Sequence, residues 1–380
     1  MNHFYISNPE AERLLGDCLR EAKEALCQTL GTSLSSLILF GSLCRGEGVW
    51  RESDGRVQIV SDVDLLAIVN RSRPLPAQLA EQTEDISQRH GVHVDVEVAT
   101  TWQIRNLWQP TLRVDLLNSQ EALVGRRFES RGDDSLQFDM NDVIALAQHR
   151  AAKCVLAIND MSSATECNDQ QLLAVEAAKT AVVCADLVTI RDGRYRPSLV
   201  ERQAYVVEAH PDLPTDFEPI RRDIVGQIDA KLRDELDIAS GKDHWLHLTH
   251  HLYTLLDACH QRDHAHIAWE DYITDHRQWR RWWLKPLTAW NNRRKLRQAC
   301  WALGWLSQRS FGDPRESIRV AALALHRARS EDLNERWLRF AEYSLATCVA
   351  PETLAPSPEL EWNRLRDQLA RLHERGIGPY

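Results

Sequence analysis

The fold is decided by the stretch Leu37-Ile38-Leu39-Phe40-Gly41-Ser42 and by the run Ser61-Asp62-Val63-Asp64-Leu65 that follows it. The first stretch is apolar and ends abruptly in a Gly-Ser pair, which predicts a buried strand closed by a tight turn. The second run continues apolar to Val69 and predicts another strand. Since alternate side chains of a strand share a face, Asp62 and Asp64 are expected to stand side by side.

A third apolar run, Val92 to Val98, carries Asp95 and Glu97 in the same alternating phase. Carboxylates held together on neighbouring strands repel one another unless a cation lies between them. A divalent metal with hard oxygen ligands meets this need, and Mg²⁺ with phosphates on its other positions is the usual case. The sequence therefore predicts a magnesium site, with two ions expected.

Helical signals surround these strands. Asn8 and Pro9 can begin a helix that Gly31 ends, and a polar helix is expected over 77–89 between the second and third strands. Residues 102–117 are mostly helical by pattern, and 121–124 can form a short closing strand. Strand, crossover helix and strand in this order favour a small mixed sheet with helices packed on it.

Helical periodicity replaces alternation after a polar linker at Glu129 to Asp134. Two good helices are expected over 142–158 and 169–190. We therefore expect an α+β protein with a catalytic domain over 1–130 and a larger all-α domain over 135–380, with a further division near Gly241.

Composition limits the class of protein. The chain has 380 residues, 27% of them charged, and a net charge of -9, which does not favour a nonspecific nucleic-acid binder but leaves a local basic patch for RNA open. Neither a secretory signal nor an apolar run of roughly 20 residues is evident.

Nine cysteines without a C-x-x-C pair indicate free thiols in a reducing cytosol, so a cytoplasmic location without a membrane partner is expected. Cys44, just after the Gly-Ser turn, reads either as a reactive thiol or as a small buried residue, and the second is favoured.

The turn itself supplies phosphate-binding groups. Gly41 leaves room for a ligand to approach the backbone, the Ser42 hydroxyl can donate to a phosphate oxygen, and Arg45 just beyond can add positive charge. With Asp62, Asp64 and Asp95, these residues suit a metal-assisted displacement at phosphorus.

The three motifs, with Val94-Asp95-Val96 as the last, resemble the nucleotidyltransferase superfamily of the DNA-polymerase-beta type. Within it the chain is most similar to the minimal and aminoglycoside-type enzymes, in which a helical domain follows the catalytic one. The resemblance covers about residues 30–125, and loosely the helices to about residue 200. It implies that Gly41 and Ser42 hold a nucleoside triphosphate, that Asp62 and Asp64 bind magnesium, and that Asp95 is the third carboxylate, as metal ligand or general base.

Two details of the resemblance stay open. Glu97 shares a face with Asp95, and some members use glutamate at the third position, although Asp95 is favoured. The longer insert between Ser42 and Asp62 suggests that a loop over 46–56 is an added lid. Related enzymes also present a basic residue from the helical domain to the triphosphate. Lys179 is selected for this role, against the alternative of a solvated lysine paired with Glu176.

Two further clusters receive mainly structural interpretations. Seven histidines lie between His244 and His266, where zinc binding is weighed but hydrogen-bonding roles are favoured. Tryptophans and arginines alternate over 277–305, which suits either base stacking or, by preference, an aromatic core with solvated arginines.

The expected function is transfer of a nucleoside monophosphate from an NTP, with ATP the first choice, to a hydroxyl of a small molecule, releasing pyrophosphate. One alternative is nucleotidylation of a macromolecule, either a protein side chain or a tRNA end as in toxin-antitoxin systems. Another is a catalytically silent nucleotide-binding or partner-binding protein. The complete carboxylate set favours an enzyme.

Overall fold

The computed structural model describes residues 2–70, 77–105, 110–129, 140–157, 167–208, 217–264, 321–328, 333–345 and 358–374. The chain divides into two compact units, and each is described by itself. The first consists of Met1–Phe138, Gly193–Tyr205 and Ile228–Glu235. The second consists of Asp139–Asp192, Val206–Gln227 and Leu236–Tyr380.

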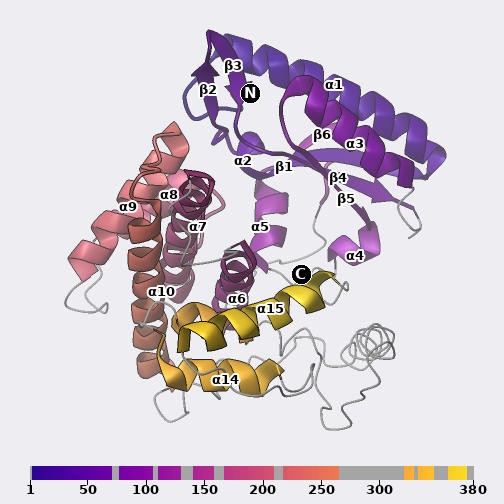
Figure 1. Ribbon diagram of the computed structural model, residues 1–380. Coiled ribbons are helices and arrows are strands. Elements are labelled where there is room, and N and C mark those ends of the chain that lie inside the picture. The colour runs from indigo at the N-terminus through magenta and orange to yellow at the C-terminus, as the bar shows by residue number, and fades with distance from the viewer. Residues whose placement is uncertain are drawn as a thin grey trace, which may run out of the picture. The chain divides into compact units, whose positions relative to one another are not determined.

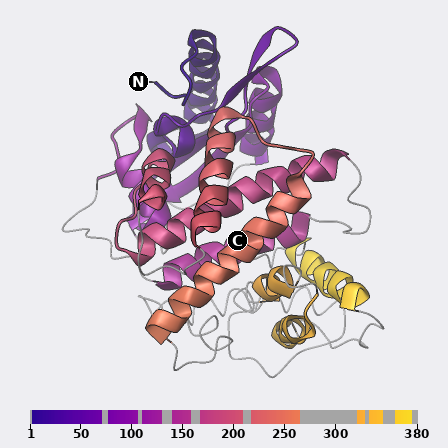
Figure 2. The same cartoon turned by 90° about the vertical axis from the view of Figure 1, so that its left-hand side faces the viewer.

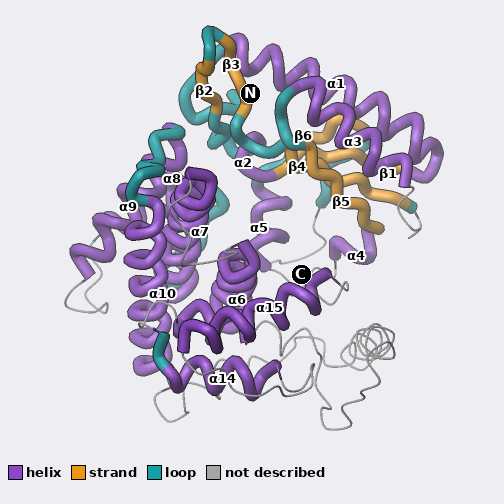
Figure 3. The backbone as a smooth tube through the Cα atoms, in the orientation of Figure 1, coloured by secondary structure: helices purple, strands orange, loops and turns teal. Residues whose placement is uncertain are grey.

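A four-stranded mixed sheet forms the centre of the first unit (Figures 1 and 3). Its strands are β1 (Leu34–Phe40), β4 (Val63–Val69), β5 (Val94–Thr100) and β6 (Glu121–Val124), in the order β5-β4-β1-β6. β4 and β5 are parallel, whereas β1 is antiparallel to both of its neighbours. Because parallel neighbours need a crossover, α3 (Ala77–His90) lies between β4 and β5 in the chain.

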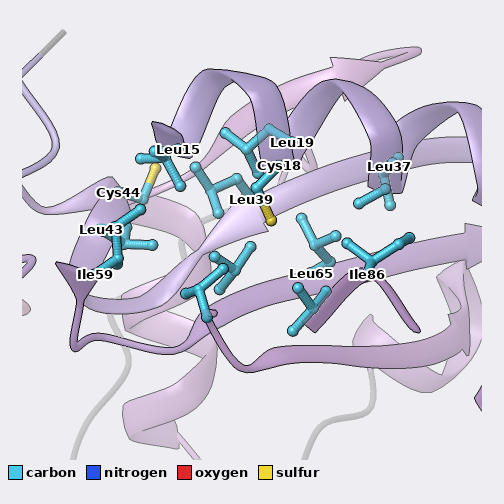
Figure 4. Close-up of a cluster of buried hydrophobic side chains, with 14 of the residues drawn as sticks. Leu15, Cys18, Leu19, Leu37, Leu39, Leu43, Cys44, Ile59, Leu65 and Ile86 are labelled. Carbon is cyan, nitrogen blue, oxygen red and sulfur yellow. The ribbon is translucent and has the colours of Figure 1, made fainter. Parts of the chain in front are cut away.

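One face of the sheet is covered by α1 (Pro9–Leu30) and α3, which lie beside each other. Figure 4 shows leucines of α1, among them Leu15 and Leu19, directed at Leu37, Leu39 and Leu65 of the strands. All of these side chains are buried, and burial of leucines of this kind stabilises by about 1.5–3 kcal/mol each.

The opposite face of the sheet carries a smaller apolar cluster and leaves room for polar groups. Ile38, Leu66 and Ile68 pack there with Ile104 of α4 (Thr101–Arg105) and Leu116 of α5 (Pro110–Asn118). Since side chains alternate along a strand, residues two positions from Leu66 share this face. Asp64 therefore belongs to the face on which α4 and α5 pack.

The insert between Ser42 and Asp62 contains a β-hairpin, in agreement with the hairpin-like excursion that its glycine-rich and charged sequence predicts, and its role as a lid stays a prediction. After the short helix α2 (Gly41–Cys44), β2 (Trp50–Ser53) pairs with β3 (Arg56–Ile59). Both turn residues, Asp54 and Gly55, have positive φ, as a two-residue hairpin turn requires. Arg51 Nε lies 3.0 Å from a carboxylate oxygen of Asp234, and Trp50 Nε1 donates to the carbonyl of Ile6 (2.7 Å). The hairpin is thus fastened to its own unit at two points.

Two later segments join the first unit, which the boundary expected at residue 130 did not include. They contain the beginning of α8 (Leu199–Val207) and the end of α9 (Phe217–Arg233). The chain therefore returns to the sheet-containing unit twice after leaving it.

The second unit is helical. It contains α6 (Met140–Ala157), α7 (Cys167–Arg191), α10 (Gly241–His264), α14 (Glu335–Leu345) and α15 (Pro358–Glu374), and residues 321–328 are helical as well. The long helices α7 and α10 pack against each other (Figure 2). The expected α+β class, a mixed sheet followed by a largely helical region, is confirmed. Within the described residues, no helix is long and apolar enough to cross a bilayer.

Candidate active site

Strand register brings the sequence motifs together at one end of the sheet. Phe40 is the Cα partner of Asp64 across β1 and β4, and Asp64 is the partner of Asp95 across β4 and β5. Gly41 follows Phe40 directly. The Gly-Ser turn and the two aspartates, which are spread over more than fifty positions of the sequence, therefore become neighbours in space.

A pocket of about 320 Å³ opens at this end of the sheet. It is lined by Phe40, Gly41, Ser42, Arg45, Asp64, Asp95, Glu97 and Asp115. Four of these eight residues are acidic and one is basic. The pocket walls therefore carry an excess of negative charge, and such a site favours a cationic species.

Gly41 is required by both its conformation and its surroundings. Its φ is +79°, in the region that L side chains rarely adopt. A Cβ at this position would lie 2.2 Å from Asp64 Oδ2. The Asp64 carboxylate therefore occupies the space that the absent side chain leaves, and the turn and the carboxylate determine each other's position.

Burial and neighbouring acids raise the pKa of two carboxyl groups in the pocket, Asp64 and Glu97. Burial, followed by the charges of Asp62 and Asp95, raises the pKa of Asp64 to about 7, although Arg45 acts in the opposite direction. Burial and the charge of Asp95 also raise the pKa of Glu97. A group near pKa 7 exchanges its proton readily at neutral pH or gives it up to a bound cation.

Most of the site residues selected from sequence line this pocket: Gly41, Ser42, Arg45, Asp64 and Asp95. Asp62 is exposed, precedes β4 and is not among the lining residues, although its charge acts on Asp64. Glu97 lines the pocket together with Asp95, since residues two positions apart on β5 share a face. The choice between Asp95 and Glu97 as the third carboxylate therefore stays open.

Asp115 is a pocket residue that the sequence motifs missed. It lies on α5 and comes within 3.6 Å of Arg45 Nη1. The available signal was weak, because Asp115 is the single acid between Trp102 and Leu117. Only the packing of α5 on the sheet brings it to the pocket.

The pocket fits a divalent cation in donor type and charge. Its carboxylate oxygens are the hard ligands that Mg²⁺ prefers. The raised pKa of Asp64 reflects its burial first and then the negative charges of Asp62 and Asp95. In the described part of the chain, no three acidic, histidine or cysteine side chains already converge in a metal-binding cluster. Asp64 and Asp95, adjacent in register, are the pair that would hold an ion.

Lys179 belongs to the second unit, on α7. Its Nζ lies 3.8 Å from Glu176 Oε1, and its side chain is 42% exposed. Glu176 is buried and also forms an ion pair with Arg150 (2.5 Å), and Cys154 Sγ donates to it (3.3 Å). Lys179 therefore pairs with Glu176, as the alternative interpretation of its sequence position expects. Its role toward a triphosphate stays a prediction.

The remaining sequence candidates have structural roles or lie outside the described residues. His251 Nε2 lies 2.7 Å from Asp223 Oδ2, and His244 Nδ1 lies 2.9 Å from Gln227 Nε2, in line with the favoured hydrogen-bonding roles. Cys44 is 2% exposed, and burial raises its pKa to about 11, which favours an inert thiol over a reactive one. The tryptophan- and arginine-rich segment 277–305 is outside the described residues.

No protein-family model matches this sequence, and no curated protein matches it either. What the pocket does must therefore be inferred from its own residues.

Proposed function

We propose that the first unit catalyses transfer of a nucleoside monophosphate from an NTP, with ATP the first choice, to a hydroxyl of a small-molecule acceptor. The hydroxyl oxygen forms a bond to the α-phosphorus, the bond between this phosphorus and the bridging oxygen to the β-phosphate breaks, and pyrophosphate leaves. The observation that carries the proposal is that one pocket holds both the Gly41-Ser42 turn and the adjacent carboxylates Asp64 and Asp95.

Each lining residue has a chemical role in this proposal. Ser42 donates its hydroxyl to a phosphate oxygen, and Gly41 lets the triphosphate approach the backbone closely. Arg45 provides a charge-assisted hydrogen bond to the polyphosphate. Asp95 serves either as a metal ligand or as the general base that accepts the proton of the acceptor hydroxyl, and Glu97 beside it is the other candidate base.

Mg²⁺ held by Asp64 and Asp95, with the charge of Asp62 nearby, would polarise the phosphoryl oxygens and offset the charge that develops on them. Two ions are proposed, because the acids outnumber the positive groups of the pocket. Without a cation the same carboxylates would repel the triphosphate, so the proposed reaction is expected to depend on a divalent metal.

The test uses the full chain, each of the four common NTPs, MgCl₂ and a panel of hydroxyl-bearing small molecules. Pyrophosphate release and an acceptor mass increased by one nucleotide are the expected results. Asp64→Asn should reduce turnover by about 10³-fold or more, because a carboxylate that stabilises the charged transition state is lost. Glu24→Gln, at an exposed glutamate on α1, is the control and should retain turnover.

Two results would contradict the proposal. Full turnover by Asp64→Asn would remove the carboxylate pocket from the reaction. If no NTP bound and none released pyrophosphate, the pocket would not have the proposed activity. If the nucleotide were transferred to a protein or an RNA instead of a small molecule, the proposed reaction would stand but the proposed acceptor would be wrong.

A further inference from the structure

Glu47 is a buried carboxylate that the proposed reaction does not use. It follows the Gly-Ser turn, is 3% exposed and is not among the residues that line the pocket. A buried carboxylate is costly unless its oxygens are paired. Its contacts therefore indicate what it does.

The two oxygens of Glu47 serve different partners. Oε1 accepts from the Ser198 hydroxyl (2.9 Å) and from the backbone amides of Leu199 and Val200, at the start of α8. Oε2 accepts from Arg45 Nε at 2.8 Å. One carboxylate thus binds the first turn of α8 with one oxygen and a pocket arginine with the other.

A second carboxylate holds Arg45 from the other side. Arg45 Nη1 lies 3.6 Å from Asp115 Oδ2, and Asp115 Oδ1 accepts from the Tyr195 hydroxyl at 3.1 Å. Tyr195 lies three residues before Ser198. The contacts therefore close a ring from Arg45 through Glu47, the segment 195–198 and Asp115 back to Arg45.

The ring fixes the direction of a flexible cation. Arg45 has a long side chain, yet it is only 13% exposed and two of its nitrogens face carboxylates. A guanidinium held in this way loses little conformational freedom when a ligand binds. All members of the ring belong to the first unit.

From this arrangement we propose that Glu47 is a positioning residue that orients Arg45 toward a phosphate-bearing ligand, with the segment Gly193–Tyr205 as its support. The inference rests on the proposed function, because it assigns Arg45 to the nucleotide. Glu47 does not touch the ligand and acts through the orientation of the guanidinium.

The test is a double-mutant cycle on the full chain, with affinity for a nonhydrolysable ATP analogue and MgCl₂ measured by calorimetry. Glu47→Gln keeps the size of the side chain but leaves only one oxygen to accept hydrogen bonds. When that oxygen accepts from the start of α8, the amide nitrogen faces Arg45 and cannot accept a hydrogen bond from it. Glu47→Gln and Arg45→Ala are each expected to weaken binding about tenfold or more. The double variant should bind like Arg45→Ala alone, because the glutamate then has no arginine to orient.

Glu24→Gln, at an exposed glutamate of α1, is the charge-matched control and should bind like the wild type. Losses that multiply in the double variant would show that Glu47 acts independently of Arg45, which would overturn the positioning role while the wild type still binds the analogue. Unchanged affinity in Glu47→Gln would overturn it as well. A wild-type protein that binds no analogue would instead contradict the proposed function, and the inference with it.

Discussion

At the scale of single residues, the pocket depends on close approach between a backbone turn and a carboxylate. Asp64 occupies the space beside Gly41, and its charge is opposed by burial and by neighbouring acids. This arrangement is unfavourable for the free protein at neutral pH, since the buried group resists ionisation. Such a conflict is typical of residues retained for function rather than for stability.

Asp64→Asn is expected to stabilise the protein at pH 8. The pKa of Asp64 is about 7 in the folded chain against an ordinary value of 3.8, so the folded state binds more protons and stability falls as the pH rises from about 4 to about 7. The variant removes this loss and should gain about 2–4 kcal/mol, which raises the melting temperature by roughly 4–16 °C. Thermal melts of the variant and the wild type at pH 4 and pH 8 measure this gain. A melting temperature of the variant equal to or below that of the wild type at pH 8 would contradict the raised pKa of Asp64.

Gly41→Ala is expected to destabilise the protein and to abolish nucleotide binding. The new Cβ would fall 2.2 Å from Asp64 Oδ2 at a residue with φ of +79°, so both the turn and the carboxylate must move. We expect a loss of about 1–3 kcal/mol. Gly16→Ala is the matched control, because Gly16 lies in α1 with nothing near its Cβ, and it should gain about 0.5–1 kcal/mol. Thermal melts of both variants give the comparison.

The elements differ in how well the sequence determines them. α1 was predictable because a cap residue, a proline and a glycine mark its ends, and the structure places it over Pro9–Leu30. The hairpin in the insert could be inferred only as a hairpin-like excursion, since polar residues dominate it. The contribution of α5 to the pocket could not be predicted, because it depends on packing of a helix without a motif onto one sheet face.

The N-cap residue of α1, Asn8, is expected to contribute to stability but not to nucleotide binding. Asn8 Oδ1 accepts from the amides of Glu10 (2.9 Å) and Ala11 (3.1 Å). Asn8→Ala should cost about 1 kcal/mol and leave nucleotide affinity unchanged, because α1 covers the face of the sheet opposite to the carboxylates. Calorimetric binding and a thermal melt on the same sample measure both effects. A change in affinity would indicate that the two faces of the sheet are coupled.

At the scale of the whole molecule, the sequence predicted the class of the fold better than the path of the chain. Strand alternation followed by helical periodicity anticipated the mixed sheet and the helical region. The return of 193–205 and 228–235 to the first unit was not predictable, because it rests on contacts such as Glu47 with Ser198 that no local pattern indicates.

Lys179 gives a test of whether the helical unit contributes to the nucleotide site. We expect Lys179→Ala to weaken binding of ATP about tenfold, as loss of one charged contact to a phosphate does. Lys242→Ala, on α10 of the same unit, is the control and should not change affinity. Equal affinity of the wild type and Lys179→Ala for ATP would contradict a role of Lys179 toward the nucleotide.

We propose above that Asp64 and Asp95 hold a divalent ion beside the Gly41-Ser42 turn. The most direct measurement is a crystal structure of the full chain with MnCl₂ and a nonhydrolysable ATP analogue, with manganese located by its anomalous scattering. We predict an anomalous peak between the carboxylates of Asp64 and Asp95, with the triphosphate against Gly41 and Ser42. Manganese and triphosphate bound elsewhere, with this pocket empty, would contradict the account.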